Sequence, residues 1–227
     1  MDESSERTYL LEQIGSVAVV RFYADRFVKL VRRQRLLAYY LAQAGIVGDE
    51  IYTDQISPYG LRLVRFLGYL ATHLDDTEDD LRSKMENYSK LVWMHHGNYD
   101  MDTYHKFTPE FTYEQLEAVV SRAWKRGTRF GFKDKRRLTE EIAYLRKPIF
   151  DPDYKPVLTS KNPPPGRDIV SASSCNLYEN VTLQDLQSMK EQHKLNSRVA
   201  RIRERIVEEP YRAGPTDGKI RPGRYAR

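Results

Sequence analysis

The sequence predicts an α+β protein that is predominantly helical, with a few short strands toward its carboxyl end. Apolar residues recur at helical spacing through the first 150 residues. Prolines then become frequent between residues 151 and 166, where helices cannot propagate. We therefore expect a helical part, residues 1–150, followed by a proline-rich connection and a small α/β part, residues 151–227. The last residues predict turns without a closing element, which is typical of an incomplete domain.

Composition excludes several classes of protein. Charged residues make up 30% of the 227 residues and the mean hydropathy is −0.68, so no transmembrane segment is expected. The acidic start of the chain lacks the features of a signal peptide, and the single Cys175 fits a reducing compartment, so we expect a cytoplasmic protein. A formal charge of +5 is only a weak sign of an anionic partner.

The first two predicted helices cover residues 17–30 and 32–44. Each has apolar residues three or four positions apart, and Leu37, Tyr40 and Leu41 lie on one face of the second. Gly45 and Gly48 predict the end of that second helix.

Helix-start signals precede the next helices. Ser57 before Pro58 predicts the start of a helix that runs through Leu70, and Thr77 opens a capping-box-like stretch before a helix that ends near Gly97.

A stronger capping box follows, in which Thr112 and Gln115 stand three residues apart at the start of a helix stopped by Gly127. A short helix over 139–145 is then expected to close at Pro148.

Beyond the prolines, residues 168–173 predict a short strand and residues 182–192 a capped helix with apolar residues on one side. Residues 197–211 fit either a helix or a strand that ends near Pro210, with a slight preference for the strand.

We expect the loop from His95 to Phe111, which we call the focal loop, to be the most important functional stretch of the chain. It joins two amphipathic segments and is rich in histidine, aspartate and aromatic residues. Loops held between rigid helices commonly present binding side chains. The alternative is that Gly97 ends a helix and Tyr99 and Phe107 cover the edge of a core.

A metal site is the less favoured interpretation of this loop. His95, His96 and His105 lie near Asp100 and Asp102, but adjacent residues on a helix point about 100° apart. Zinc motifs place two histidines on one face, as H-E-x-x-H does. We expect these histidines to be solvated or hydrogen-bonded.

The basic strip at residues 125–137, which begins at Lys125 and ends at Arg137, is a candidate for nucleic-acid binding. Its cations alternate with aromatic residues, as in proteins that bind single strands. The small net charge favours a basic connector, and RNA or partner binding through this strip stays an alternative.

No nucleophile or general base is predicted. Cys175 and His193 lack a motif that would bring them together, and the adjacent Glu140 and Glu141 diverge around a helix axis.

Several stretches form an ordered set over nearly the whole chain: residues 35–45, Gly97-Asn98-Tyr99 with 106–109, 174–178, 181–185, 195–198 and 211–214. Read together, they resemble the amino-terminal part of the dipeptidyl peptidase III family of zinc metallopeptidases, most closely its bacterial branch. Members of this family release dipeptides from the amino end of oligopeptides. The resemblance implies that residues 197–211 form two strands joined near Arg203 and Glu204.

The family's zinc is held by an H-E-x-x-G-H helix and a later glutamate motif, and neither occurs in this sequence. The resemblance therefore implies a non-catalytic amino-terminal lobe that is inactive alone. No catalytic residue, metal ligand or cofactor is expected in this chain, and zinc is expected only in a full-length member. The implied partners are the zinc-bearing lobe of the peptidase and its oligopeptide substrate. No membrane partner is expected, and nucleic acid is the less favoured alternative.

Candidate contacts with the substrate cleft or with the other lobe come from the matching stretches and the focal loop. The favoured alternative is that these residues support the ends of helices and do not contact substrate. An Asn-Tyr pair that follows a helix-ending glycine is adequately explained by helix capping. The candidates are Asn98, Tyr99, Asp102, Lys106, Phe107 and Asn176.

Overall fold

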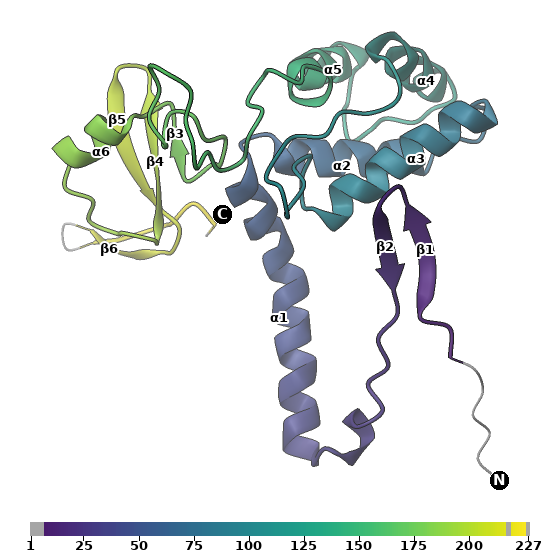
Figure 1. The fold of residues 1–227 in the computed structure, drawn as a ribbon, viewed down its shortest axis with the longest axis horizontal. Helices are drawn as coiled ribbons and strands as arrows, with labels where there is room; N and C mark the ends of the chain where they lie inside the picture. The colour runs from purple at the N-terminus through teal and green to yellow at the C-terminus, as the bar shows by residue number, and fades with distance from the viewer. Residues whose placement is uncertain (1–6, 217–218, 226–227) are drawn as a thin grey trace. The chain divides into compact units, whose positions relative to one another are not determined.

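The predicted α+β class is confirmed in the computed structural model, which describes residues 7–216 and 219–225 (Figure 1). The described residues form six α-helices and a few short strands, most of them toward the carboxyl end. None of these helices combines the length and apolar character needed to cross a membrane. The chain divides into two units, residues 1–49 and 50–227, and each is described by itself.

The first unit begins with a β-hairpin where a helix over 17–30 was expected. Strand β1 (Leu10–Ile14) pairs antiparallel with β2 (Val17–Val20) across a two-residue loop in which Gly15 has φ +59°. A single turn of 3-10 helix, Phe27–Lys29, follows. The helix prediction was wrong because β-branched residues directly after a glycine-containing two-residue loop favour a hairpin over a helix.

Helix α1 (Arg32–Ile56) starts where the sequence predicted but does not end at Gly45 or Gly48. Glycine within a helix costs about 1 kcal/mol relative to alanine, which slows propagation without forbidding it. The last turn of α1 is buried in the second unit, where Asp54 and Ile56 are 8% and 5% exposed. Tertiary contacts of that turn thus outweigh the weak propensity of the two glycines.

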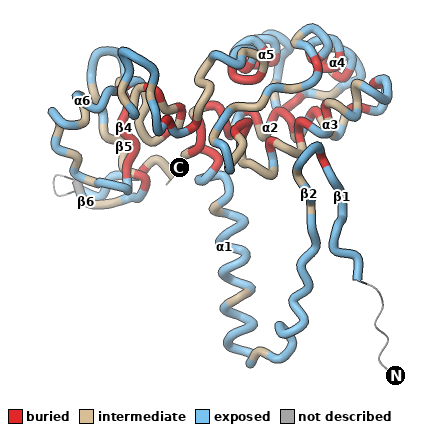
Figure 2. The backbone as a smooth tube through the Cα atoms, viewed as in Figure 1, coloured by how far each residue is buried: buried red, intermediate tan, exposed pale blue. Residues whose placement is uncertain are grey.

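Four helices of the second unit share one apolar core (Figure 2). They are α2 (Gly60–Ala71), α3 (Asp79–Met94), α4 (Tyr113–Lys125) and α5 (Lys135–Phe150). Each contributes apolar residues at a spacing of three or four, which puts them on a single buried face. Leu63 and Leu70 of α2 and Met85 of α3 are fully buried.

The helix-start predictions succeeded unevenly. At α4, Thr112 Oγ1 accepts a hydrogen bond from Gln115 N at 3.2 Å, and Gln115 Oε1 accepts one from Thr112 N at 2.8 Å, which confirms the capping box. Ser57 and Thr77 cap nothing, because α2 and α3 begin later in the chain without a side-chain cap.

Helix α5 is longer at both ends than the sequence predicted. It begins after Asp134, whose side chain accepts a hydrogen bond from Arg137 N at 2.9 Å, and it passes through Pro148. Pro148 removes one helical hydrogen bond, but only in the last turn. Its carbonyl accepts a hydrogen bond from Asn98 Nδ2 at 2.7 Å, so a side chain from elsewhere in the unit supports this helix end.

A three-stranded sheet follows the prolines. The short β3 (Tyr178–Glu179) pairs parallel with β4 (Ser197–Ile202), which pairs antiparallel with β5 (Arg205–Pro210). This confirms the preference for strand at residues 197–211 and the turn at Arg203, which has φ +56°.

Two further elements complete the carboxyl part. Thr182 caps α6 (Leu183–Ser188) as predicted, although this helix ends earlier than expected. Strands β6 (Gly214–Thr216) and β7 (Lys219–Arg221) then pair antiparallel, where only turns were predicted.

The strand predicted at residues 168–173 was wrong, because these residues form turns. One oxygen of Asp168, Oδ1, accepts hydrogen bonds from Val170 N and Ser171 N, both at 2.8 Å. An aspartate that bonds the backbone two and three residues further along offers the chain an alternative to a strand.

Candidate functional site

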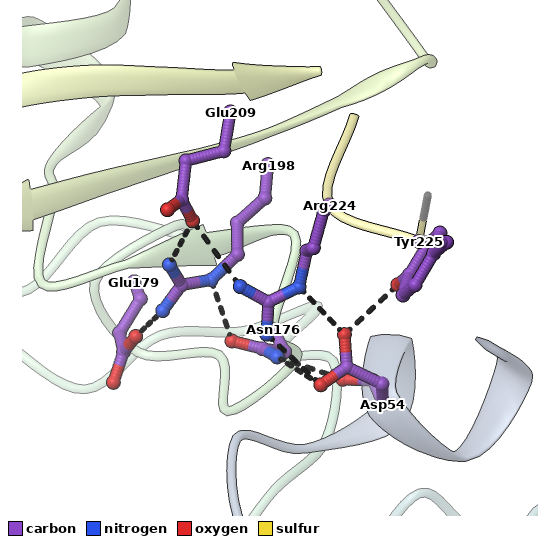
Figure 3. Close-up of polar contacts among 7 residues, drawn as sticks. All are labelled: Asp54, Asn176, Glu179, Arg198, Glu209, Arg224 and Tyr225. Atoms are coloured by element: carbon purple, nitrogen blue, oxygen red, sulfur yellow. Dashed lines mark hydrogen bonds and ion pairs between the residues drawn. The ribbon is translucent and has the colours of Figure 1, made fainter. Parts of the chain in front are cut away.

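Seven side chains of the second unit form what we call the polar cluster (Figure 3): Asp54, Asn176, Glu179, Arg198, Glu209, Arg224 and Tyr225. They come from the last turn of α1, the loop before β3, all three strands of the sheet and the segment after β7. The polar cluster is therefore the place where widely separated parts of this unit are joined.

Asp54 forms the first half of the polar cluster. Its two carboxylate oxygens accept hydrogen bonds from Arg224 Nε at 2.8 Å and Arg224 Nη2 at 2.9 Å, in a bidentate pair. The Tyr225 hydroxyl donates to the same carboxylate at 2.9 Å. These charge-assisted bonds raise the pKa of the Arg224 guanidinium, chiefly through Asp54 and against the effect of burial.

Arg198 forms the second half. Its Nε donates to Asn176 Oδ1 at 2.8 Å, its Nη1 donates to Glu209 at 2.6 Å, and its Nη2 is paired with Glu179. Only 9% of the Arg198 side chain is exposed, so these partners replace most of the water that the guanidinium would otherwise bind.

Asn176 and Glu209 connect the two halves. Asn176 Nδ2 donates to the backbone oxygen of Asp54 at 2.8 Å, while Glu209 Oε2 accepts from both Arg198 and Arg224, the latter at 3.2 Å. The three carboxylates and two guanidinium groups sum to a charge of −1. Each of these charged groups has an opposite charge beside it, so the cluster is suited to holding segments in place.

A cavity of about 480 Å³ borders the polar cluster and is lined in part by Asp54, Glu209 and Arg224. The same three side chains are already joined in ion pairs. This arrangement fixes the position of the segment after β7 and leaves no carboxylate of the polar cluster poised as a general base.

Gly223 lets that segment approach the chain closely. A Cβ atom at this position would overlap the backbone of Arg212 and lie 2.5 Å from the carbonyl oxygen of Tyr211. The ring of Tyr211 stacks on that of Tyr225, with 5.2 Å between their centroids, and burial raises the pKa of Tyr211 to about 12. Glycine is the residue that permits such a backbone contact.

Of the six residues predicted from the sequence, only Asn176 lies in the polar cluster. Asn98 and Tyr99 are fully buried in the helical part, where Tyr99 Oη lies 2.5 Å from Tyr59 Oη and donates to the Lys155 carbonyl at 2.9 Å. The structure thus separates the predicted residues into two groups, one at the helix ends and one beside the sheet.

The other three predicted residues, Asp102, Lys106 and Phe107, lie further along the same loop. Phe107 packs edge-on against Tyr88, Asp102 is exposed, and Lys106 Nζ donates to the backbone oxygens of Asp151, at 2.7 Å, and Tyr154. Lys106 therefore holds the end of α5 through two carbonyl groups.

Burial lowers the pKa of Lys106 to about 8, against the opposing attraction of Asp151 and Asp153. Between pH 8 and the ordinary lysine pKa of 10.5, the unfolded chain binds a proton that the folded chain lacks. Stability therefore increases with pH across this interval. We expect the free energy of unfolding of the wild type to rise with pH relative to that of Lys106→Met, measured by urea denaturation at several pH values.

Lys84→Met is the control for this measurement: a hydrogen bond to the Asp80 carboxylate raises the pKa of Lys84, so this lysine is protonated in the folded and unfolded chain over the same interval and should add no rise of stability with pH. An unchanged difference between the wild type and Lys106→Met across the interval would contradict the assignment.

The histidines of the focal loop do not converge. His95 Nδ1 accepts a hydrogen bond from Met101 N at 3.3 Å, His96 lies edge-on to Tyr52, and His105 is exposed beside Val157. Within residues 7–216 and 219–225, no group of three or more His, Cys, Asp or Glu side chains could hold a metal ion.

Sequence reasoning missed the charged members of the polar cluster. Arg198 lies within a stretch that was singled out, but nothing local indicated its role. Asp54 and Arg224 are 170 residues apart, and no periodicity or spacing connects them. Only a covarying pair or a folded structure could have linked them.

No protein-family model matches the chain. A search of curated proteins also finds no match.

Proposed function

We propose that this chain is the non-catalytic amino-terminal lobe of a zinc-dependent dipeptidyl peptidase similar to the dipeptidyl peptidase III family. The observation that carries the proposal is the ordered set of matching stretches, which runs from residue 35 to residue 214. Each matching stretch alone is weak evidence, but seven matches rarely occur in the order of the family by chance.

The positions of the matching residues support this proposal. Asn176, Arg198 and Tyr211 come from three separate stretches, and all three lie in or against the polar cluster. Asn98 and Lys106, from the earlier stretches, both bond to backbone oxygens at the end of α5. Residues that join distant segments in this way are those that a scaffold has to retain.

In such a peptidase, zinc would polarise the scissile carbonyl and acidify a bound water. The residues of this chain do not fit a zinc site, because no H-E-x-x-G-H occurs in the sequence and no suitable group forms among the described side chains. We therefore assign the chemistry to a second lobe and give this chain the role of supporting it.

Helix α1 offers a surface for that second lobe. Leu37, Tyr40 and Leu41 lie on one face of the helix, within a matching stretch, and are 58%, 66% and 62% exposed. The sequence predicts that they share one face of this helix. Large apolar side chains grouped on one exposed face are typical of a docking surface. We call this group the α1 apolar face and propose the zinc-bearing lobe as its partner.

An oligopeptide substrate would then lie between the lobes. Strand β5 is at an edge of the three-stranded sheet, and extended peptides commonly add to such an edge through backbone hydrogen bonds. This substrate contact belongs to the complete enzyme and depends on the docking of the second lobe.

The proposal is tested with the purified chain and a separately produced zinc-bearing lobe of a bacterial dipeptidyl peptidase III. Alone, the chain should neither bind zinc stoichiometrically nor cleave an arginyl-arginyl reporter amide. Mixed with the second lobe, it should restore turnover that a chelator abolishes. Chelator-sensitive turnover by the chain alone would show that the catalytic group is within it.

Leu41→Asp and Ala42→Asp form a matched pair for the docking surface. Both add one carboxylate to an exposed position of α1, but Ala42 lies on the other side of the helix from the α1 apolar face. Leu41→Asp should weaken the restored activity at least tenfold, and Ala42→Asp should leave it nearly unchanged. Equal effects of the two substitutions would argue against docking through this face.

The basic strip at residues 125–137 is less suited to nucleic acid in the folded chain than its composition suggested. Phe130 is 3% exposed and packs on Phe66, so it would have to leave the core to stack on a base. Arg126 is paired with Asp76, and Arg129 lies over the ring of Trp124 at 4.5 Å. We therefore propose no function in RNA binding.

A further inference from the structure

A second cavity, of about 250 Å³, lies between the turns that follow the prolines and the start of α6. Three cationic side chains line it, Lys155, Arg167 and Arg201, together with one carboxylate, Asp185. Asp185 is already paired with Arg201 at 2.7 Å. The three positive charges and one negative charge leave an excess of two positive charges around this cavity.

Lys155 is a partly buried cation of this cavity without an opposite charge beside it. Its side chain is partly buried, and among the described residues its ammonium group has no ion-pair or hydrogen-bond partner. Burial lowers its pKa, and the nearby Arg198 lowers it further while the Cys175 thiol opposes the shift. A desolvated ammonium without an anion is costly, so a partner from outside the chain would stabilise it.

The backbone at Lys155 is also strained. Lys155 has φ +51°, a conformation that non-glycine residues adopt rarely and that clusters at functional sites. Its carbonyl accepts the hydrogen bond from the Tyr99 hydroxyl, which holds the residue in place. The surrounding structure therefore keeps this lysine beside the cavity at some energetic cost.

Ser174 lies in the lining of the same cavity, where it is 2% exposed and its hydroxyl is buried beside that of Tyr99. Arg167, which also lines the cavity, is exposed and forms no ion pair within the described residues.

We propose that this cavity binds a small tetrahedral oxyanion of the phosphate or sulfate class, held by Lys155 and Arg167. The oxygens of such an anion accept several hydrogen bonds at once, which suits an ammonium and a guanidinium that lack anionic partners among the described residues. The volume exceeds that of a lone phosphate, so the anion can be free or the head group of a larger molecule. This inference is independent of the proposed role in a peptidase.

The test is isothermal titration of the full chain with inorganic phosphate at low ionic strength. Binding should be saturable, and affinity should fall at least tenfold in Lys155→Met and in Arg167→Gln. Lys155→Arg should retain most of the affinity, because it keeps the charge. Lys161→Met is the matched control, since this lysine is close in sequence but does not line the cavity, and it should bind phosphate as the wild type does.

Circular dichroism of each variant confirms that the fold is retained, and a rise in melting temperature with phosphate gives a second measure of binding. Titration with O-phosphoserine distinguishes a head group from a free ion, because a head group should bind at least as tightly. Absence of binding at millimolar phosphate would overturn the proposal. An equal loss of affinity in Lys161→Met, or tighter binding of acetate than of phosphate, would overturn it as well.

Discussion

Replacing Asp54 with alanine is expected to lower the free energy of unfolding by about 3 kcal/mol, at the lower end of the range for breaking a buried ion pair. The substitution removes the acceptor of two Arg224 hydrogen bonds and one from Tyr225, while the Arg224 side chain remains only 27% exposed. An arginine that is three-quarters buried cannot recover full hydration. Urea denaturation monitored by circular dichroism measures the loss.

Glu50→Ala is the matched control for Asp54→Ala, because it removes a carboxylate from the same helix. Glu50 is paired with Arg65 at 2.9 Å, but the two side chains are 66% and 62% exposed. Exposed ion pairs contribute roughly 0–1 kcal/mol, so this variant should be nearly as stable as the wild type. A similar loss in both variants would show that the polar cluster is no more important than the surface.

The double variant Asp54→Ala/Arg224→Met shows how much of the stability loss comes from the missing ion pair and how much from the arginine that is left without Asp54. With both charged groups removed, no buried guanidinium is left with Glu209 as its one remaining anion, so part of the stability lost in Asp54→Ala should return. A strictly additive double variant would mean that Asp54 and Arg224 act independently, which the bidentate geometry does not allow.

Leu63→Ala is expected to be among the most damaging substitutions in the helical part, with a loss of roughly 2–5 kcal/mol. Leu63 of α2 is 0% exposed within the common apolar core, and neighbouring side chains collapse only partly into the cavity that alanine leaves. The loss combines the transfer free energy of the missing methyl groups with the cost of that cavity. Its measurement is again the free energy of unfolding in urea.

Leu37→Ala makes the same chemical change on α1, where the leucine is 58% exposed. Its effect on the isolated chain should stay within about 0.5 kcal/mol, as for most surface substitutions. If Leu37→Ala proved as costly as Leu63→Ala, the α1 apolar face would have to be buried within the chain, and its proposed use for docking would be wrong.

Local signals explain where the sequence was a reliable guide. The capping box of Thr112 and Gln115 was readable because it involves two side chains three positions apart. The cap at Thr182 was readable for the same reason, since its Oγ1 accepts from Asp185 N at 3.1 Å. Interactions over three or four residues depend little on the rest of the fold.

Local helix propensity predicted the wrong helix ends where tertiary contacts opposed it. Pro148 predicted the end of α5, yet the hydrogen bond from Asn98 to its carbonyl, across 50 residues, supports the last turn. Gly45 and Gly48 predicted the end of α1, yet the burial of its last turn carries the helix on to Ile56. In both cases a moderate local cost was offset by contacts that no window of sequence contains.

The sequence by itself determined the class of fold, the helical periodicity of the first part and the change in character after the prolines, because these depend on composition and short-range spacing. The tertiary structure alone decided that Asp54, Asn176, Arg198, Glu209 and Arg224 meet in one polar cluster. It also decided that Lys155 and Arg167 line one cavity without anionic partners among the described residues. Electrostatic and hydrogen-bond partners are selected by distance in space, and distance in space follows from the packing of the whole unit.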